Sequence, residues 1–87
     1  MSEELTAEEI AAHFSAMDDS VTLINATIAD DTDALEMYGD AAGVKLMVTR
    51  NTDQLELQAT KDWYSDSSKS KTPYTNAVTA GKAYVAG

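Results

Sequence analysis

The stretch NTDQLELQATKDWYSD, residues 51–66, decides the fold because it fits two different secondary structures. As a strand, it alternates Leu55, Leu57 and Ala59 with polar residues, and it could pair with the apolar segment before it. As a helix, it places Leu55, Ala59 and Trp63 on one face. The choice separates an all-α fold from an α+β fold.

The helix over residues 41–65 is the favoured interpretation, and a hairpin at about residues 44–60 is the alternative. The hairpin would turn at NTD, residues 51–53, where a loop of this length normally needs a glycine in the left-handed conformation. A lone hairpin would also need a third strand or a covering helix. The segment is rich in Gln, Glu, Leu, Met, Lys and Ala, which favour helix.

This helix would have apolar residues on two faces. The broad face holds Val44, Met47, Val48, Leu55, Ala59 and Trp63. The narrow, opposite face holds Leu46, Leu57 and Tyr64. A helix that is apolar on two faces is either enclosed in a core or offers one face to another chain. We therefore predict that the narrow face is a protein interface.

A second helix is predicted from about Ala7 to Ala29. Thr6 and Glu9 form a capping box, in which each side chain satisfies a free backbone N–H of the first turn. An apolar stripe with steps of four and three residues follows the cap. The stripe consists of Ile10, Phe14, Met17, Val21, Ile24 and Ile28.

The rest of the chain predicts a linker, a loop and a third helix. Residues 30–40 form a linker with one helical turn that Gly39 can end. Residues 65–71 form a polar loop, after which Thr72 caps a helix and Pro73 occupies its first position. The expected fold is one small all-α domain, residues 1–87, of three antiparallel helices.

Aromatic residues add to the predicted interface. Trp63 and Tyr64 precede the polar loop, and Trp and Tyr are enriched at interface hot spots. Tyr74 and Tyr84 belong to the last helix, whose small residues allow close packing against a neighbour. Trp63 could instead close the core of the domain.

The charge distribution narrows the function classes. The net charge is −9, which disfavours binding to nucleic-acid phosphates or anionic lipid. Residues 1–40 carry eleven acids and no Lys or Arg, whereas residues 41–87 carry six bases and four acids. The two halves could attract within one molecule or between neighbours in an array. There are no cysteines, so disulfides are excluded.

No signal for membrane insertion or secretion is found. The start, MSEELTAEE, is too acidic for a signal peptide. No apolar run approaches the roughly 20 residues that span a bilayer. We expect a protein made in the cytoplasm that has no membrane partner.

Catalytic and metal sites are not indicated. His13 is the only histidine, and no nearby acid or nucleophile selects it as a base. The cluster Asp30, Asp31 and Asp33 does not match a calcium loop, because Leu35 and Glu36 stand where an oxygen ligand and glycine are required. We predict no enzyme, no cofactor, no metal and no small-molecule substrate.

Two segments resemble small proteins of marine tailed phages, notably those that infect cyanobacteria. They are LELQATKDW, Leu55 to Trp63, and NAVTAGKAYVA, Asn76 to Ala86. The resemblance implies a phage origin and a place in the virion, and it transfers no catalytic residue. The expected function is a non-enzymatic structural or accessory protein of a capsid or tail, bound to other virion proteins or to copies of itself. The alternative is a small acidic inhibitor that mimics DNA and acts on a host enzyme.

Overall fold

The computed structural model describes residues 5–87, which form three long helices and two short ones. The long helices are α1 (Ala7–Ala29), α3 (Ala41–Gln58) and α5 (Thr72–Ala86). The short helices are α2 (Thr32–Tyr38) and α4 (Asp62–Asp66). No strand occurs within residues 5–87, so the all-α prediction is confirmed and the hairpin alternative is wrong.

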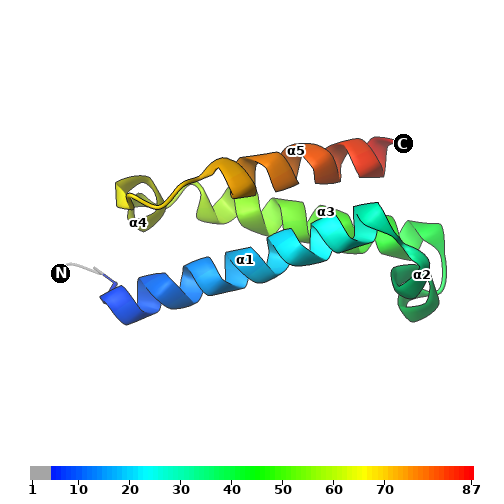
Figure 1. The fold of residues 1–87 in the computed structure, drawn as a ribbon, viewed down its shortest axis with the longest axis horizontal. Coiled ribbons are helices and arrows are strands. Elements are labelled where there is room, and N and C mark those ends of the chain that lie inside the picture. The colour runs from blue at the N-terminus through cyan, green and yellow to red at the C-terminus, as the bar shows by residue number, and fades with distance from the viewer. Residues whose placement is uncertain (1–4) are drawn as a thin grey trace.

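The long helices lie side by side and alternate in direction along an elongated body (Figure 1). The described chain measures 46 × 21 × 18 Å along its principal axes. Helix α2 occupies the end where α1 connects to α3, and α4 occupies the opposite end, between α3 and α5 (Figure 1). The predicted antiparallel three-helix arrangement is present, with a short helix in each connection.

Helix α1 has the predicted bounds because local signals define both ends. The backbone N–H of Thr6 donates to Glu9 Oε1 at 2.8 Å, and the N–H of Glu9 donates to Thr6 Oγ1 at 3.1 Å. After α1, the Asp30 carboxylate accepts hydrogen bonds from the Thr32 N–H at 3.0 Å and from its hydroxyl. These bonds lower the pKa of Asp30 and fix the turn into α2.

A glycine and an aspartate separate α2 from α3. Gly39 has a backbone φ of 89°, which residues other than glycine rarely adopt, and it ends α2 as predicted. Asp40 then caps α3, because its Oδ1 accepts a hydrogen bond from the Gly43 N–H at 2.8 Å.

Helix α3 ends at Gln58, so the prediction of one helix through residue 65 is wrong. The N–H groups of Thr60 and Lys61 bond to carbonyls three residues earlier, at 3.1 and 3.0 Å, which tightens the last turn. Lys61 is then extended, with ψ of 148°, and α4 begins at the next residue. Ala59, which we expected in the core, is exposed.

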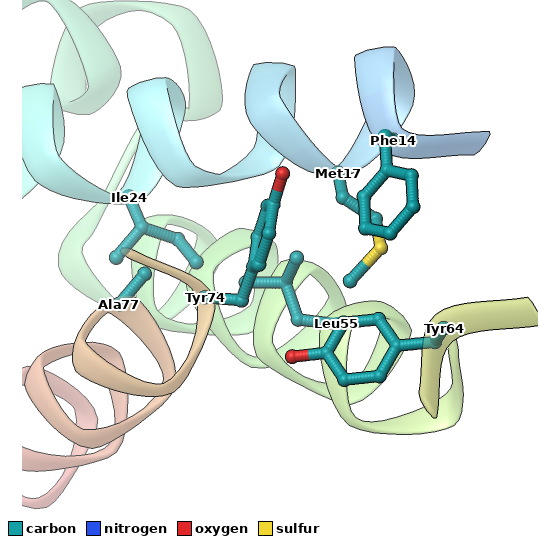
Figure 2. Close-up of a cluster of buried hydrophobic side chains, with 7 residues drawn as sticks. All are labelled: Phe14, Met17, Ile24, Leu55, Tyr64, Tyr74 and Ala77. Carbon is teal, nitrogen blue, oxygen red and sulfur yellow. The ribbon is translucent and has the colours of Figure 1, made fainter. Parts of the chain in front are cut away.

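The larger of two core clusters joins α1, α3, α4 and α5 (Figure 2). Its buried members are Phe14, Met17, Ile24, Leu55, Tyr64, Tyr74 and Ala77. Aromatic rings dominate one end, where the Tyr74 ring centroid lies 5.9 Å from that of Phe14 and 6.1 Å from that of Tyr64. Helix α4 contributes Tyr64 to this cluster.

The smaller core cluster joins α2, α3 and α5. Its buried members are Val44, Met47 and Val48, against which Ala34, Leu35, Tyr84 and Val85 pack. Ile28, expected in the stripe of α1, is 39% exposed. The preceding residue of α1, Thr27, is buried instead, and its hydroxyl donates to the Leu23 carbonyl at 2.8 Å. That local bond satisfies the hydroxyl and lets a polar residue replace the expected isoleucine.

Helix α5 approaches α3 closely at Gly81. A Cβ atom placed there would overlap Thr52 Cγ2 and would lie 3.3 Å from Val48 Cγ1. The glycine is therefore required by space. At the start of α5 the structure differs by one residue from the prediction: Lys71 holds the cap position, and Thr72 is already helical.

Candidate interaction surface

The structure divides the six predicted interface residues into three groups. Leu46 and Leu57 are exposed, at 50% and 49%. Trp63 and Tyr84 are half-buried and pack against the core clusters. Tyr64 and Tyr74 are buried, at 7% and 2% exposed.

The prediction that Tyr64 shares an exposed face with the two leucines is wrong. The break after Gln58 starts a new helix, so the heptad relation between Leu57 and Tyr64 no longer places them on one side. Tyr74 is likewise a core residue, since its ring packs against those of Phe14 and Tyr64, which also contact each other (Figure 2). Neither ring offers a surface to a partner in this fold.

The outward face of α3 is the largest remaining part of the predicted interface. Leu46, Arg50, Asp53 and Leu57 follow one another at steps of four, three and four residues. This spacing keeps all four on one side of a helix, opposite the face that carries Val44, Val48 and Leu55 into the core. All four are exposed, and Arg50, Asp53 and Leu57 line a shallow open depression together with Asn51 and Gln54.

The two charges at the centre of this face have no ionic partner within residues 5–87. The ion pair present in that part of the chain joins Lys82 Nζ to Glu56 Oε2 at 2.7 Å, beside α5. Arg50 and Asp53 therefore present unneutralised, opposite charges between two exposed leucines. Sequence analysis identified the leucines but did not consider the charges between them.

Trp63 links α4 to α1 through two rings. It stacks on His13 with ring centroids 4.8 Å apart and planes at 16°, and it meets Phe14 edge-on at 5.2 Å. The loop after α4 contributes two cations, because Lys69 lies over the Phe14 ring at 5.7 Å and Lys71 over the Tyr64 ring at 5.3 Å. Through these two lysines, the polar loop contacts the aromatic end of the core, although its sequence shows no packing signal.

Two tyrosine hydroxyls connect α5 to acids of the first half of the chain. Tyr74 donates to Asp18 Oδ1 at 2.6 Å, and Tyr84 donates to Asp31 Oδ2 at 3.1 Å. Burial and the neighbouring carboxylate raise the pKa of both phenols, because ionisation would place a second negative charge beside the acid. Among the described residues no ion pair joins residues 5–40 to residues 41–87, and these two hydrogen bonds connect the halves without a cation.

Exposed acids cover the first half of the described chain. The exposed members are Glu8, Glu9, Asp18, Asp19, Asp30, Asp33, Glu36 and Asp40. Within residues 5–87, no group of three or more metal-binding side chains comes together.

Further apolar side chains are exposed near the α1–α2 connection. Leu23 and Ile28 of α1 are 40% and 39% exposed, and Met37 and Tyr38 of α2 are 77% and 43% exposed. Met37 was not predicted as an exposed apolar residue, because a helix of two turns is too short to carry a periodic signal. In the part of the chain that the structure covers, no helix combines the length and apolarity needed to cross a bilayer.

Comparison of the chain with protein-family models, with curated proteins and with solved structures gave no match.

Proposed function

We propose that this chain is a non-enzymatic structural or accessory protein of a phage particle, in the capsid or tail, and that it acts through contacts with other proteins. The observation that carries the proposal is the outward face of α3. This face leaves Leu46 and Leu57 half exposed although the bundle already has a closed core on the opposite side of the helix. Exposed leucines in such a small protein favour a protein partner.

Two further features support an assembled state. The chain has 87 residues and no cysteine, so its small core is supported by tight helix packing or by association with other subunits. The resemblance of residues 55–63 and 76–86 to small phage proteins supports the particle as the place of assembly.

The test is mass spectrometry of purified, salt-washed particles of a phage that encodes this chain. We expect the chain in a fixed ratio to the major capsid or tail protein, and in the same ratio after the washes. A nuclease-treated lysate of the same infection, depleted of particles, is the control for free protein. Loss of the chain from the particles at the first salt wash would contradict a structural role.

The second candidate is a small acidic inhibitor that mimics DNA and binds a host enzyme. The observation that favours it is the run of exposed acids on α1 and α2. Carboxylates on a helical surface can occupy phosphate positions in a basic groove. The test is affinity capture from host lysate, in which a DNA-binding protein should be retained at low salt and released by about 1 M salt, where the screening length is about 3 Å. A capture variant with Asp19 and Asp33 changed to Asn should then retain less of it.

A further inference from the structure

The outward face of α3 has a sequence symmetry about its own midpoint. Its four residues, Leu46, Arg50, Asp53 and Leu57, are centred on the midpoint between Asn51 and Thr52. Reversing the direction of the helix exchanges Leu46 with Leu57 and Arg50 with Asp53. The face is therefore apolar at both ends and has opposite charges at exchangeable positions in the middle.

We propose that α3 pairs with α3 of a second copy of this chain, antiparallel and about a two-fold axis at that midpoint. In this register each Leu46 meets Leu57 of the other copy, and each Arg50 meets Asp53. The proposal deepens the proposed function, on which it rests in assigning this face to protein contacts. It names the partner as the chain itself.

The spacing of the four residues is that of a coiled-coil seam. Steps of four, three and four residues are those between successive d and a positions of a heptad, and α3 has 18 residues over which to present them. In an isologous contact the same patch serves both copies, so residue i meets residue j and j meets i. A polar pair in such a seam fixes the register, because any shift brings Arg50 or Asp53 against leucine.

Charge favours this face over the acidic surfaces of α1 and α2. Helix α3 carries Lys45, Arg50, Asp53 and Glu56 and is neutral overall, whereas the whole chain has a net charge of −9. Two copies that met through α1 and α2 would bring exposed acids together. Two copies that met through α3 would instead neutralise two charges that lack ionic partners within residues 5–87.

The surface relief agrees with this register. Arg50, Asp53, Gln54 and Leu57 border the depression on α3, and a hole between residues i, i+3, i+4 and i+7 is what a coiled-coil knob enters. The antiparallel register places Arg50 of the second copy over this depression, with its stem on Leu57 and its guanidinium beside Asp53. A contact between two single helices is smaller than the roughly 800 Å² per partner of a standard interface, so the dimer should depend on concentration.

The experiment is sedimentation equilibrium of the full chain over a wide concentration range, from micromolar to millimolar. The wild-type chain should self-associate to a dimer. Arg50→Asp makes both central charges negative and Asp53→Arg makes both positive, so each variant alone should lose about tenfold or more in association constant. A mixture of the two variants should form a heterodimer, and the double variant Arg50→Asp/Asp53→Arg should recover the homodimer.

Matched controls separate the seam from net charge and from folding. Asp33→Arg on α2 changes the net charge as Asp53→Arg does, and Lys61→Asp changes it as Arg50→Asp does; both control sites are exposed and lie off the seam. These two variants should dimerise like the wild-type chain. Far-UV circular dichroism should be the same for all variants, because Arg50 and Asp53 make no ionic contact within the described chain.

Three results would each overturn the proposal. The first is a wild-type chain that stays monomeric up to about 1 mM, a concentration that would reveal any binding free energy stronger than about −4 kcal/mol. The second is an association constant that Arg50→Asp and Asp53→Arg leave unchanged, and the third is no recovery of the dimer in the mixture and in the double variant. These results are independent of the proposed function. If the chain is monomeric but is found in salt-washed particles, only the dimer proposal is contradicted. If the chain is a dimer but is missing from the particles, only the proposed role in the particle is contradicted.

Discussion

Gly81→Ala tests how closely α5 approaches α3. The new methyl group would overlap Thr52 Cγ2, with Val48 Cγ1 at 3.3 Å and Ile24 Cγ2 at 3.4 Å, so buried side chains close it in. Thr52 is 2% exposed, and its hydroxyl donates to the Thr49 carbonyl at 2.8 Å. Relief of the overlap must therefore come from rotation of Thr52, which breaks this bond, or from movement of α5 away from α3.

Two effects of opposite sign determine the size of the change. Inserting a methyl group into a packed core costs about 1–3 kcal/mol. Replacing glycine by alanine in a helix contributes about 1 kcal/mol in the other direction. We expect Gly81→Ala to lower the free energy of unfolding by about 1 kcal/mol, and the melting temperature by about 4–8 °C.

A double-mutant cycle with Thr52→Ser isolates the overlap, because the helix-propensity effect cancels in the cycle. Serine keeps the hydroxyl and removes the methyl group that the introduced alanine side chain would meet. Alone, Thr52→Ser should cost about 1 kcal/mol for the lost buried methyl group. In the Gly81→Ala background it should be neutral or stabilising, a coupling of at least about 1 kcal/mol.

The measurement is urea unfolding followed by far-UV circular dichroism and by the fluorescence of Trp63, the only tryptophan. The wild-type chain, the two single variants and the double variant must have equal m-values, since equal m-values show that only stability has changed. Two results together would refute the reasoning. They are stabilisation by Gly81→Ala of the full ~1 kcal/mol expected from propensity, and additivity of the two changes within about 0.5 kcal/mol.

Three further changes test the core and its hydrogen bonds. Tyr74→Phe removes the 2.6 Å bond to Asp18 and should lower the free energy of unfolding by about 1–2 kcal/mol, measured as a shift of the urea midpoint. Because the folded state raises the pKa of Tyr74 above 10.0, the contribution of this phenol to stability should be constant below about pH 10 and be lost above it, and Tyr74→Phe should flatten that fall in an alkaline titration of the urea midpoint. Ile24→Ala, at a site that is 0% exposed, should cost about 2–5 kcal/mol, and a loss below 1 kcal/mol would contradict the packing. Lys82→Ala breaks a solvent-exposed ion pair with Glu56, so the shift of the urea midpoint should correspond to a loss of less than about 1 kcal/mol in the free energy of unfolding.

The parts of the fold that were predictable are those whose signals are local. Thr6 and Glu9 cap α1 through each other, Gly39 ends α2 by its own conformation, and the stripe on α1 needs only a count of residues. The exposed pair Leu46 and Leu57 was also predictable, because both positions follow from the phase of α3 alone. None of these depends on a distant contact.

The break after Gln58 could not be predicted, since no glycine or proline marks it. Residues 59–61 would continue a helix in isolation, and the turn is stabilised by what it brings together: Tyr64 with Phe14 and Trp63 with His13. The buried position of Tyr74 depends in the same way on Asp18, 56 residues earlier. Such long-range packing overrides local propensity.

The same break sets how long the outward seam of α3 can be. In an uninterrupted helix Tyr64 would stand one heptad beyond Leu57 and would lengthen the stripe shared with Leu46. The three residues between α3 and α4 turn that ring into the core, where it is 7% exposed. In the proposed antiparallel dimer, the contact between the two copies would therefore end at Leu57, because the next aromatic side chain of the stripe is buried in its own chain. If that dimer forms, a variant with one continuous helix across this junction should lose stability and gain contact area.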